Sequence, residues 1–234
     1  MDNKELTKLV VETVIDRLYF ETVKDKHITN RLNLKIPIGV SLRHAHLSQK
    51  DIDVLFGKGY ELQFRNELQP GQYAAKETIT LLGPKNILAN VRVLAPVRKV
   101  SQVEISQTDA FHLGITPPLR DSGQLTGSAG IVLVGPVGCL KLEEGVIKAA
   151  RHIHFDTINA KKLGIKDGDR VRVIINGDRG LIFNNVLARV DDQYRLELHI
   201  DTDEANAAGV KTGDFALLYN SVKGSDFHGY RPFG

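Results

Sequence analysis

Four stretches of the sequence repeat one local pattern, and this repeat constrains the fold more than any other feature. Each stretch opens on a His or Glu that we call the lead residue; the four lead residues are His46, Glu104, His154 and His199. Ser or Asp follows two positions later, and Asp, Asn or Glu three positions after that, as in a helix N-cap with a capping box. A glycine ten or eleven residues after each lead residue is typical of a helix C-cap. The pattern predicts four copies of a strand followed by a short capped helix.

The other strand-like runs are short. One, at 36–42, precedes the first copy, and the rest lie between or after the copies, at 79–82, 87–93, 131–134, 171–175, 181–188 and 215–218. Gly- and Asp-rich turns connect several of them. Many short strands with few helices are typical of a mainly β protein, and we expect two small β-barrels capped by short α-helices. The first barrel is expected to combine 35–47 with 151–219, and the second to comprise 48–150. Residues 220–234 would form a C-terminal tail.

The spacing of apolar residues in 4–20 predicts an amphipathic helix that precedes this repeated region. Its apolar residues recur at helical spacing, at Leu6, Leu9, Val10, Val14 and Leu18. A polar stretch at 24–33 then separates the helix from the first strand-like run. We therefore expect 1–26 to form an N-terminal extension outside the core fold.

The composition favours a cytoplasmic protein. Hydrophobic residues make up 42% of the chain and charged residues 25%, as in an ordinary globular protein. No window approaches the roughly eighteen apolar residues of a membrane span, and the N-terminus lacks the order of a secretory signal. A single cysteine, Cys139, rules out an internal disulfide and suits a reducing interior. Basic and acidic residues alternate, with a net charge of +3, so we expect neither nucleic acid nor membrane as a partner.

A second histidine stands two positions before two of the lead residues, at His44 and His152. Residues two apart on a strand share a face, so each His-x-His pair can chelate an ion. Three imidazoles with one carboxylate suit a tetrahedral Zn²⁺ site, and two further histidines would leave positions open for catalysis. A lone histidine is more often an ordinary core or surface residue. Two pairs at equivalent points of a repeat favour metal binding instead.

Several motifs in the same order resemble the PduL-type phosphotransacylases, also called phosphate propanoyltransferases. The resemblance covers about residues 36–219. The motifs are GVSLRHAHLS at 39–48, QPGQYAAKE at 69–77, RVLAPVR at 92–98, QVEIS at 102–106, LRDSG at 119–123 and ARHIH at 150–154. Leu42 departs from the family, which commonly has a polar residue at that position.

The resemblance implies a reversible transfer of an acyl group between coenzyme A and inorganic phosphate. It implies two zinc ions, no covalent acyl-enzyme, and a site between two helix-capped β-barrels. Carried over by motif, the metal ligands divide into a pair and a set of four: His44 and His46 for one zinc, and Glu104, His152, His154 and His199 for the other. Arg98 would bind the phosphate, and Ser41 and Ser122 would line the site. No residue is assigned to coenzyme A.

The resemblance also implies a role for the N-terminal helix as an encapsulation peptide for a bacterial microcompartment, with shell or core proteins as partners. The alternative is a helix that packs on its own barrel or at a dimer interface. We also expect a homo-oligomer.

Two other functions remain open at this stage. A zinc-dependent thioester or phosphoester hydrolase would use the same ligands with hydroxide as the nucleophile. A non-catalytic, zinc-stabilised binding module would need only four ligands that close the metal site, whereas six candidates are present. Acetyl and propanoyl groups differ by one methylene, worth about 1–3 kcal/mol in a pocket, and the sequence does not choose between them.

Overall fold

The computed structural model describes residues 34–221, so the predicted extension at 1–26 and nearly all of the predicted tail lie outside the described residues. The strands of the first half are β1 (Lys35–Ser41), β2 (His44–Ser48), β3 (Phe64–Gln69), β4 (Gln72–Leu82), β5 (Ile87–Arg98), β6 (Gln102–Glu104) and β7 (Leu119–Arg120). Those of the second half are β8 (Ala129–Val134), β9 (Cys139–Ala149), β10 (His152–Phe155), β11 (Arg170–Ile175), β12 (Leu181–Val190), β13 (Glu197–Asp201) and β14 (Phe215–Ser221). The helices are α3 (Gln49–Phe56), α4 (Gln107–Leu113), α5 (Thr157–Leu163) and α6 (Thr202–Ala208).

Six strands close into a barrel in the order β1-β13-β10-β12-β11-β14. β1 runs parallel to β13 and β10 runs parallel to β12, while the other neighbours are antiparallel. Alternate residues of each strand point inward. Ile36, Ile38, Ile153 and Phe155 are fully buried in the apolar core of this barrel.

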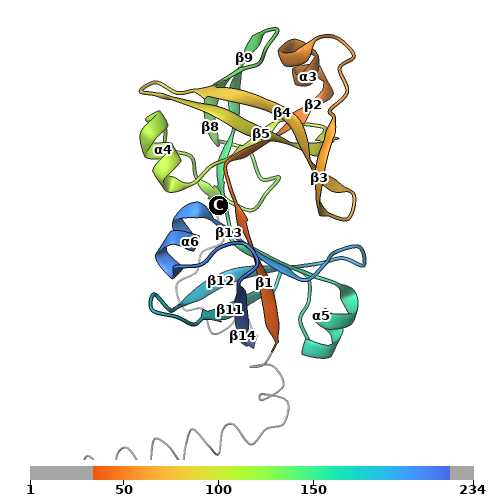
Figure 1. Ribbon diagram of the computed structural model, residues 1–234, viewed down its shortest axis with the longest axis vertical. Coiled ribbons are helices and arrows are strands. Elements are labelled where there is room, and N and C mark those ends of the chain that lie inside the picture. Colours follow the sequence, from red (N-terminus) through yellow and green to blue (C-terminus); the bar gives the residue numbers. More distant parts are fainter. Residues whose placement is uncertain (1–33, 222–234) are drawn as a thin grey trace, which may run out of the picture.

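The remaining strands form a second sheet in the order β3-β4-β5-β2-β6-β9-β7, and β8 pairs with both β4 and β9. Because of β8, the pairs β4-β5-β2-β6-β9-β8 also close into a ring. This ring has its own core, which includes Leu47, Ile52, Leu81 and Leu133. The prediction of a mainly β fold with short helices is confirmed. Figure 1 shows these two bodies, the ring and the barrel, one above the other, with the helices at their margins.

The barrel and the ring have the same arrangement of parallel and antiparallel neighbours. β1, β13, β10, β12, β11 and β14 of the barrel correspond in order to β9, β6, β2, β5, β4 and β8 of the ring. Only two residues, Leu42 and Arg43, separate β1 from β2, and only Ala150 and Arg151 separate β9 from β10. In both places the chain leaves a strand of one body and enters a His-x-His strand of the other. These two crossings join the bodies (Figure 1).

The predicted boundary after residue 47 differs from the observed pairing. β2 was expected in the first barrel, but it pairs with β5 and β6 of the ring. The pairing of β1 with β13 ends at Ser41 and Asp201. Asp201 is the N-cap of α6, so the chain beyond it turns into a helix and offers β1 no further strand partner.

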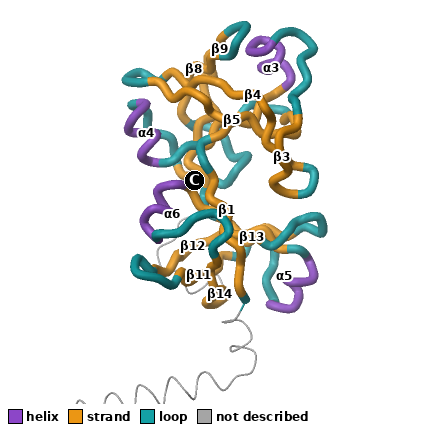
Figure 2. The backbone as a smooth tube through the Cα atoms, viewed as in Figure 1, coloured by secondary structure: helices purple, strands orange, loops and turns teal. Residues whose placement is uncertain are grey.

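The predicted N-caps are confirmed in all four copies. Ser48, Ser106, Asp156 and Asp201 have extended backbones and each accepts a hydrogen bond from the backbone N–H three residues later. Gly114, Gly164 and Gly209 end their helices in the left-handed conformation, as predicted. Gly57 also ends its helix, but with φ 110° and ψ 150°. In Figure 2 each of these helices is a short segment directly after a strand.

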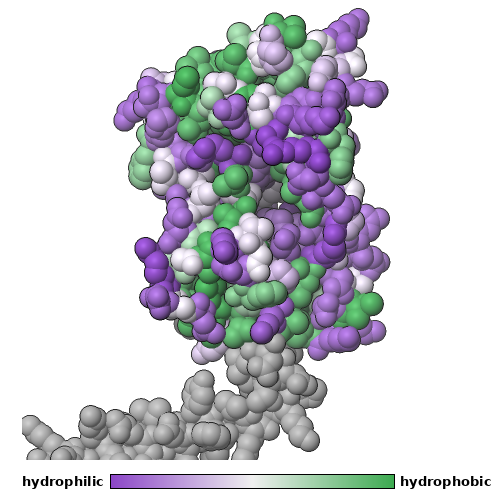
Figure 3. Space-filling model, viewed as in Figure 1, coloured by the Kyte–Doolittle hydropathy of each residue, from purple (hydrophilic) through white to green (hydrophobic). Residues whose placement is uncertain are grey.

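Hydrophilic and hydrophobic residues are interspersed over the face shown in Figure 3, and hydrophilic side chains border the level at which the two bodies meet. Among the described residues, no helix is both long and apolar enough to cross a membrane.

Candidate metal and phosphate site

The alternation of strands β2 and β10 turns both His-x-His pairs away from the two cores. Ala45 and Leu47 are fully buried in the ring core, so His44 and His46 lie on the opposite face of β2. Their exposed fractions are nevertheless only 7% and 5%. β10 repeats this arrangement, with Ile153 and Phe155 in the barrel core and His152 and His154 on the other face. His44, His46 and His154 are thus buried between elements and not within a hydrophobic core, and His152 is partly buried there.

Strand pairing adds the other two lead residues to these pairs. His44 lies opposite Glu104 in the β2–β6 ladder, and His152 lies opposite His199 in the β10–β13 ladder. The result is two clusters of three residues. His44, His46 and Glu104 form the ring cluster, and His152, His154 and His199 form the barrel cluster; within each, one possible ligand atom per residue lies within 4.8 Å of the others.

This grouping differs from the division into a pair and a set of four that the resemblance implied. Glu104 was expected with the barrel histidines, but its Oε2 lies 3.4 Å from Nε2 of His44. The reason is the antiparallel register of β2 and β6, which places the two residues side by side. Each cluster therefore contains three candidate ligands.

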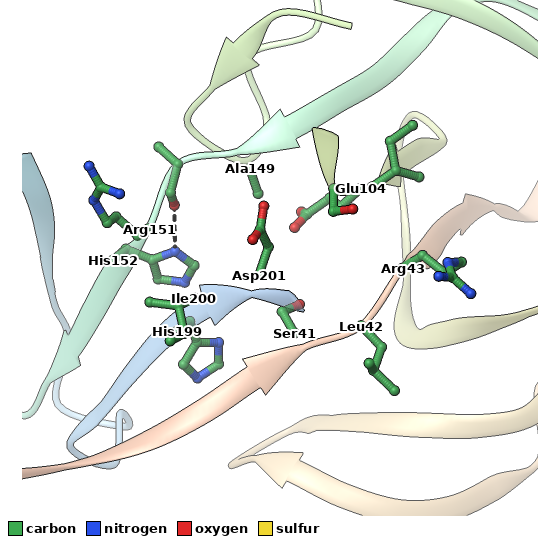
Figure 4. A pocket seen from close by; sticks show the side chains of 13 residues that line it. Ser41, Leu42, Arg43, Glu104, Ala149, Arg151, His152, His199, Ile200 and Asp201 are labelled. Carbon is green, nitrogen blue, oxygen red and sulfur yellow. Dashed lines mark hydrogen bonds between the residues drawn. The ribbon is translucent and has the colours of Figure 1, made fainter. Parts of the chain in front are cut away.

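One cavity connects the two clusters. Its lining includes Glu104 from the ring cluster, His152 and His199 from the barrel cluster, and both crossings between the bodies. In Figure 4 the rings of His152 and His199 lie near each other, and the carboxylate of Glu104 points into the same space. Ser41, the last residue of β1, also lines the cavity, and its Oγ lies 3.4 Å from Nδ1 of His44.

Each crossing ends in an arginine that holds a neighbouring helix. Nη2 of Arg43 lies 2.7 Å from Oδ1 of Asp109, the capping-box residue of α4. Nη1 of Arg151 lies 2.6 Å from Oε1 of Glu204, the equivalent residue of α6. These ion pairs fix the residue before each His-x-His pair to the helix that follows Glu104 or His199.

The first histidine of each pair is oriented by the backbone. Nδ1 of His44 lies 2.8 Å from the carbonyl oxygen of Leu42, and Nδ1 of His152 lies 3.0 Å from that of Ala150. A carbonyl only accepts, so each Nδ1 donates, and in the neutral ring the lone pair is then on Nε2. Metal-binding histidines commonly donate their other N–H in this way.

Burial favours the neutral form of three of the histidines, His46, His152 and His154. Burial, followed by the nearby His44 and Arg98, lowers the pKa of His46 to about 2. Burial, His199 and Arg189 lower the pKa of His154 to about 3. The pKa of His152 also lies well below its ordinary value, chiefly because of burial and the neighbouring His199. Neutral imidazoles have the free lone pair that a metal requires.

Glu104 remains an anion in these surroundings. Burial alone would raise the pKa of its carboxyl group, but His44, a hydrogen bond from Ser122, His152 and Arg98 together hold the pKa below its usual value. Ser122 Oγ donates to Oε1 at 2.9 Å. The ring cluster therefore offers two imidazoles and one carboxylate.

The chemistry of both clusters fits zinc. Imidazole and carboxylate are ligands that Zn²⁺ takes in proteins. Nδ1 of His46 and Nδ1 of His154, at equivalent positions of the two copies, are buried without a hydrogen-bond partner among the described residues. Buried nitrogens without a partner commonly face an ion or water, as Nδ1 of His154 can, whereas in His46 Nε2 accepts from Arg98 and therefore has the lone pair of the ring.

Arg98, predicted to bind phosphate, lies at the end of β5 beside the ring cluster. Its Nη2 donates to Nε2 of His46 at 3.0 Å and its Nη1 to Oγ of Ser122 at 3.3 Å. Burial lowers the pKa of Arg98, Glu104 opposes that shift, and Arg189 adds to it. The structure thus brings Arg98 and Ser122 to the predicted metal ligands.

Sequence reasoning missed residues that stand two positions before Glu104 and His199. Gln102 is almost fully buried, and its Nε2 donates to Oε1 of Glu104 at 2.5 Å and to Oγ of Ser122 at 2.8 Å. Glu197 holds His199 in a similar way, with Oε2 2.7 Å from Nε2. The signal was available, because the same strand spacing that revealed His44 and His152 places these two residues on the site face.

Arg189 was also missed. It lies opposite His154 in the β10–β12 ladder. Its charge lowers the pKa of Arg98, His152 and His154. Only the pairing of β12 with β10 brings it to the site, and no motif marks it.

Fold and site together define a mainly β protein with paired imidazole and carboxylate clusters beside an arginine. The sequence profile of the phosphate propanoyltransferase family matches residues 37–211. The chain belongs to the phosphate propanoyltransferase family, and it is therefore an acyltransferase.

Relatives from several bacteria carry the same name. A phosphate propanoyltransferase of Thermotoga maritima is 59% identical over 185 residues, which cover 78% of this chain and 88% of that protein. One from Salmonella typhimurium is 52% identical over 209 residues, covering 88% and 93%. One from Lachnoclostridium phytofermentans is 47% identical over 206 residues, covering 88% and 96%.

Proposed function

We propose that this chain transfers a short acyl group, acetyl or propanoyl, between coenzyme A and inorganic phosphate at a site with two zinc ions. The observation that carries the proposal is the pair of three-residue clusters beside one cavity, with Arg98 hydrogen-bonded to His46 of the ring cluster. The family description supports phosphate and a propanoyl group as reactants.

His44, His46 and Glu104 would hold one zinc ion, and His152, His154 and His199 the other. Three protein ligands leave a position for substrate, as in catalytic sites, whereas a structural zinc is closed by four. This count favours an enzyme over a zinc-stabilised binding module. Bound zinc supplies Lewis-acid stabilisation of the negative charge that develops on the thioester carbonyl oxygen.

Arg98 would bind the phosphate. A guanidinium presents two parallel N–H groups that match two phosphate oxygens, and such charge-assisted bonds are stronger in a partly buried site. The hydroxyl of Ser122 accepts from Nη1 of Arg98 and so restricts the direction in which the guanidinium points. Gln102 holds Ser122 in turn.

In the forward direction, a phosphate oxygen attacks the carbonyl carbon of the thioester. A carbon–oxygen bond forms, the carbon–sulfur bond breaks, and its electron pair leaves with the sulfur as the thiolate of coenzyme A. A thiol has a pKa of about 8.5, so the thiolate needs little help from an acid. The reaction requires no nucleophilic side chain, and Cys139 is exposed at the start of β9.

The test is the release of coenzyme A from acetyl-CoA and from propanoyl-CoA by zinc-loaded protein, with and without phosphate. We expect release only with phosphate, together with an acyl phosphate that hydroxylamine traps. Equal release without phosphate would instead identify the zinc-dependent hydrolase. No release from either thioester would favour the binding module.

A further inference from the structure

Glu197 contacts His199 in a way that decides which ring nitrogen can bind a metal. Its Oε2 lies 2.7 Å from Nε2 of His199. An ionised carboxylate only accepts hydrogen bonds, so Nε2 carries the proton and Nδ1 keeps the lone pair. His199 is thus held in a defined orientation by a side chain of its own strand.

The tautomer of His199 is the opposite of that in His44 and His152. Those two histidines donate Nδ1–H to backbone carbonyls, which leaves Nε2 free. His199 has no such bond to a carbonyl among its hydrogen bonds in the described residues. The side chain of Glu197 replaces the backbone as the group that sets the tautomer.

Glu197 is itself fixed from the other body of the molecule. Nε2 of Gln69, at the end of β3, donates to Oε2 of Glu197 at 2.8 Å. Oε1 of Gln69 accepts from the backbone N–H of Arg195 at 3.0 Å. Gln69 is only 3% exposed. A buried amide with both ends bonded holds the carboxylate more rigidly than solvent would.

The neighbouring strand leaves room for this carboxylate at Gly39. Gly39 lies opposite His199 in the β1–β13 ladder. A Cβ at this position would lie 3.0 Å from both Cδ and Oε1 of Glu197. The backbone of Gly39 does not itself need glycine, because its φ is not in the left-handed region. The absence of a side chain therefore matters for the position of Glu197.

The equivalent position of the other body has the same relation to its lead residue. Gln102 stands two residues before Glu104 and donates to it, as Glu197 stands two residues before His199 and accepts from it. In each copy the polarity is matched, with an amide donor for a carboxylate and a carboxylate acceptor for an imidazole.

We propose that Glu197 is a positioning residue that holds His199 in the Nε2–H tautomer and directs Nδ1 to the metal of the barrel cluster. The proposal rests on the metal site proposed above. Glu197 would act through His199 and would not itself bind the ion, because the barrel cluster contains His152, His154 and His199 without it.

The first test uses metal-free protein, so it does not depend on zinc or on activity. Long-range ¹H–¹⁵N correlation spectra report the tautomer of each histidine, with His199 assigned from a His199→Gln variant. We expect the Nε2–H form in the wild type and in Glu197→Gln, whose amide oxygen still accepts. Glu197→Ala should give a mixture of tautomers. A pure Nε2–H form in Glu197→Ala would overturn the proposal.

The second test measures zinc affinity by competition with a chelator. We expect Glu197→Ala to weaken one of the two sites roughly 10–100-fold and to leave the other unchanged. Glu197→Gln should weaken it less. Gly39→Ala, which displaces the carboxylate but retains it, should fall between the wild type and Glu197→Ala. Equal and complete loss of one zinc in Glu197→Gln and Glu197→Ala would show direct ligation and overturn the positioning role.

Glu143→Ala is the matched control, because Glu143 is an exposed carboxylate whose partner is Lys141 on the same strand. It should behave as the wild type in both tests. If the wild type bound no zinc, the proposed function would fail, while the tautomer measurement would still decide whether Glu197 orients His199.

Discussion

His46 and His154 illustrate how surroundings, and not residue type, define the site. Both occupy the second position of a His-x-His pair, both are buried, and neither Nδ1 atom has a hydrogen-bond partner within the part of the chain that the structure describes. Burial is the largest cause of the low pKa in each case. The same residue type at His112 is exposed, and its ring lies 3.2 Å from a backbone carbonyl of β5. Packing therefore separates these histidines, in agreement with the sequence pattern, which includes His46 and His154 but not His112.

The division of ligands into two clusters of three can be tested at the residue scale. We expect the double variant His44→Ala/Glu104→Ala to lose about one zinc per chain, because both residues belong to the ring cluster. His152→Ala/His199→Ala should lose the other. Metal analysis by mass spectrometry of the purified proteins measures both. Loss of both ions from the first variant would contradict the grouping and favour a Glu104 that serves the barrel histidines.

Arg98→Lys tests the phosphate site. Lysine keeps the charge but lacks the fork that binds two oxygens, and a charge-assisted hydrogen bond contributes about 1.5–3 kcal/mol. We expect the KM for phosphate to rise roughly 10–100-fold, with the KM for acyl-CoA and the zinc content unchanged. Steady-state kinetics with phosphate varied checks this. An unchanged KM for phosphate would place the anion elsewhere.

At the scale of elements, the short capped helices could be read from the sequence more accurately than the strands. A cap depends on a few neighbouring residues, as at Ser106 with Asp109 or Asp201 with Glu204. The predicted strand at 79–82 is only the end of β4 (Gln72–Leu82), and β9 (Cys139–Ala149) was not predicted. Polar outward-facing residues interrupt the apolar pattern of β4 and of β9. The backbone hydrogen bonds that hold the rest of each strand are made with neighbouring strands from other parts of the chain.

The cap of α5 gives a prediction for stability. Asp156→Ala removes the side chain that accepts from the N–H of Asn159 at 2.8 Å. Loss of such an N-cap costs about 0.5–2 kcal/mol. We expect this decrease in the free energy of unfolding at pH 7, measured by urea denaturation. Asp156→Asn, which can still cap the helix, should cost less.

The pH dependence of this loss has a definite sign. The hydrogen bond from the Asn159 backbone, first among several, lowers the pKa of Asp156 in the folded protein. The ionised carboxylate therefore stabilises the fold above its unfolded pKa of about 3.9, and this contribution is lost as the pH falls through the lower folded value. The difference between wild type and Asp156→Ala should shrink as the pH is lowered from 7 towards 3. A difference in the free energy of unfolding that stays constant over this pH range would contradict the stabilising role of the ionised Asp156.

At the scale of the whole molecule, the barrel and the ring depend on each other, because β1 of the barrel leads directly into β2 of the ring and β9 of the ring leads directly into β10 of the barrel. We propose that they form two domains, one of β1 with β10–β14 and the other of β2–β9, which shifts the sequence-based boundary so that β2 joins the second. Each has a separate apolar core. The chain crosses between them twice beside the two ligand clusters, so the site depends on both domains being folded.

Deletion of residues 1–26 tests the predicted N-terminal extension. Both clusters and both cores lie within 34–221, so we expect the shortened chain to fold and to keep its transferase activity. If the extension targets a microcompartment, co-purification with shell proteins is lost. Loss of folding would favour a helix that packs on its own barrel. Light scattering on both forms measures the predicted self-association and whether the extension contributes to it.

The sequence by itself determined the features that depend on near neighbours: the four capped helices, the two His-x-His pairs and the lead residues Glu104 and His199. These follow from cap chemistry and strand spacing, which act over a few residues. Only the tertiary structure decided that Glu104 lies beside His44 and His46, that β2 belongs to the ring, and that Arg189 reaches the site. The register between distant strands decides each of these, because backbone pairing, and not local preference, sets which side chains lie opposite one another.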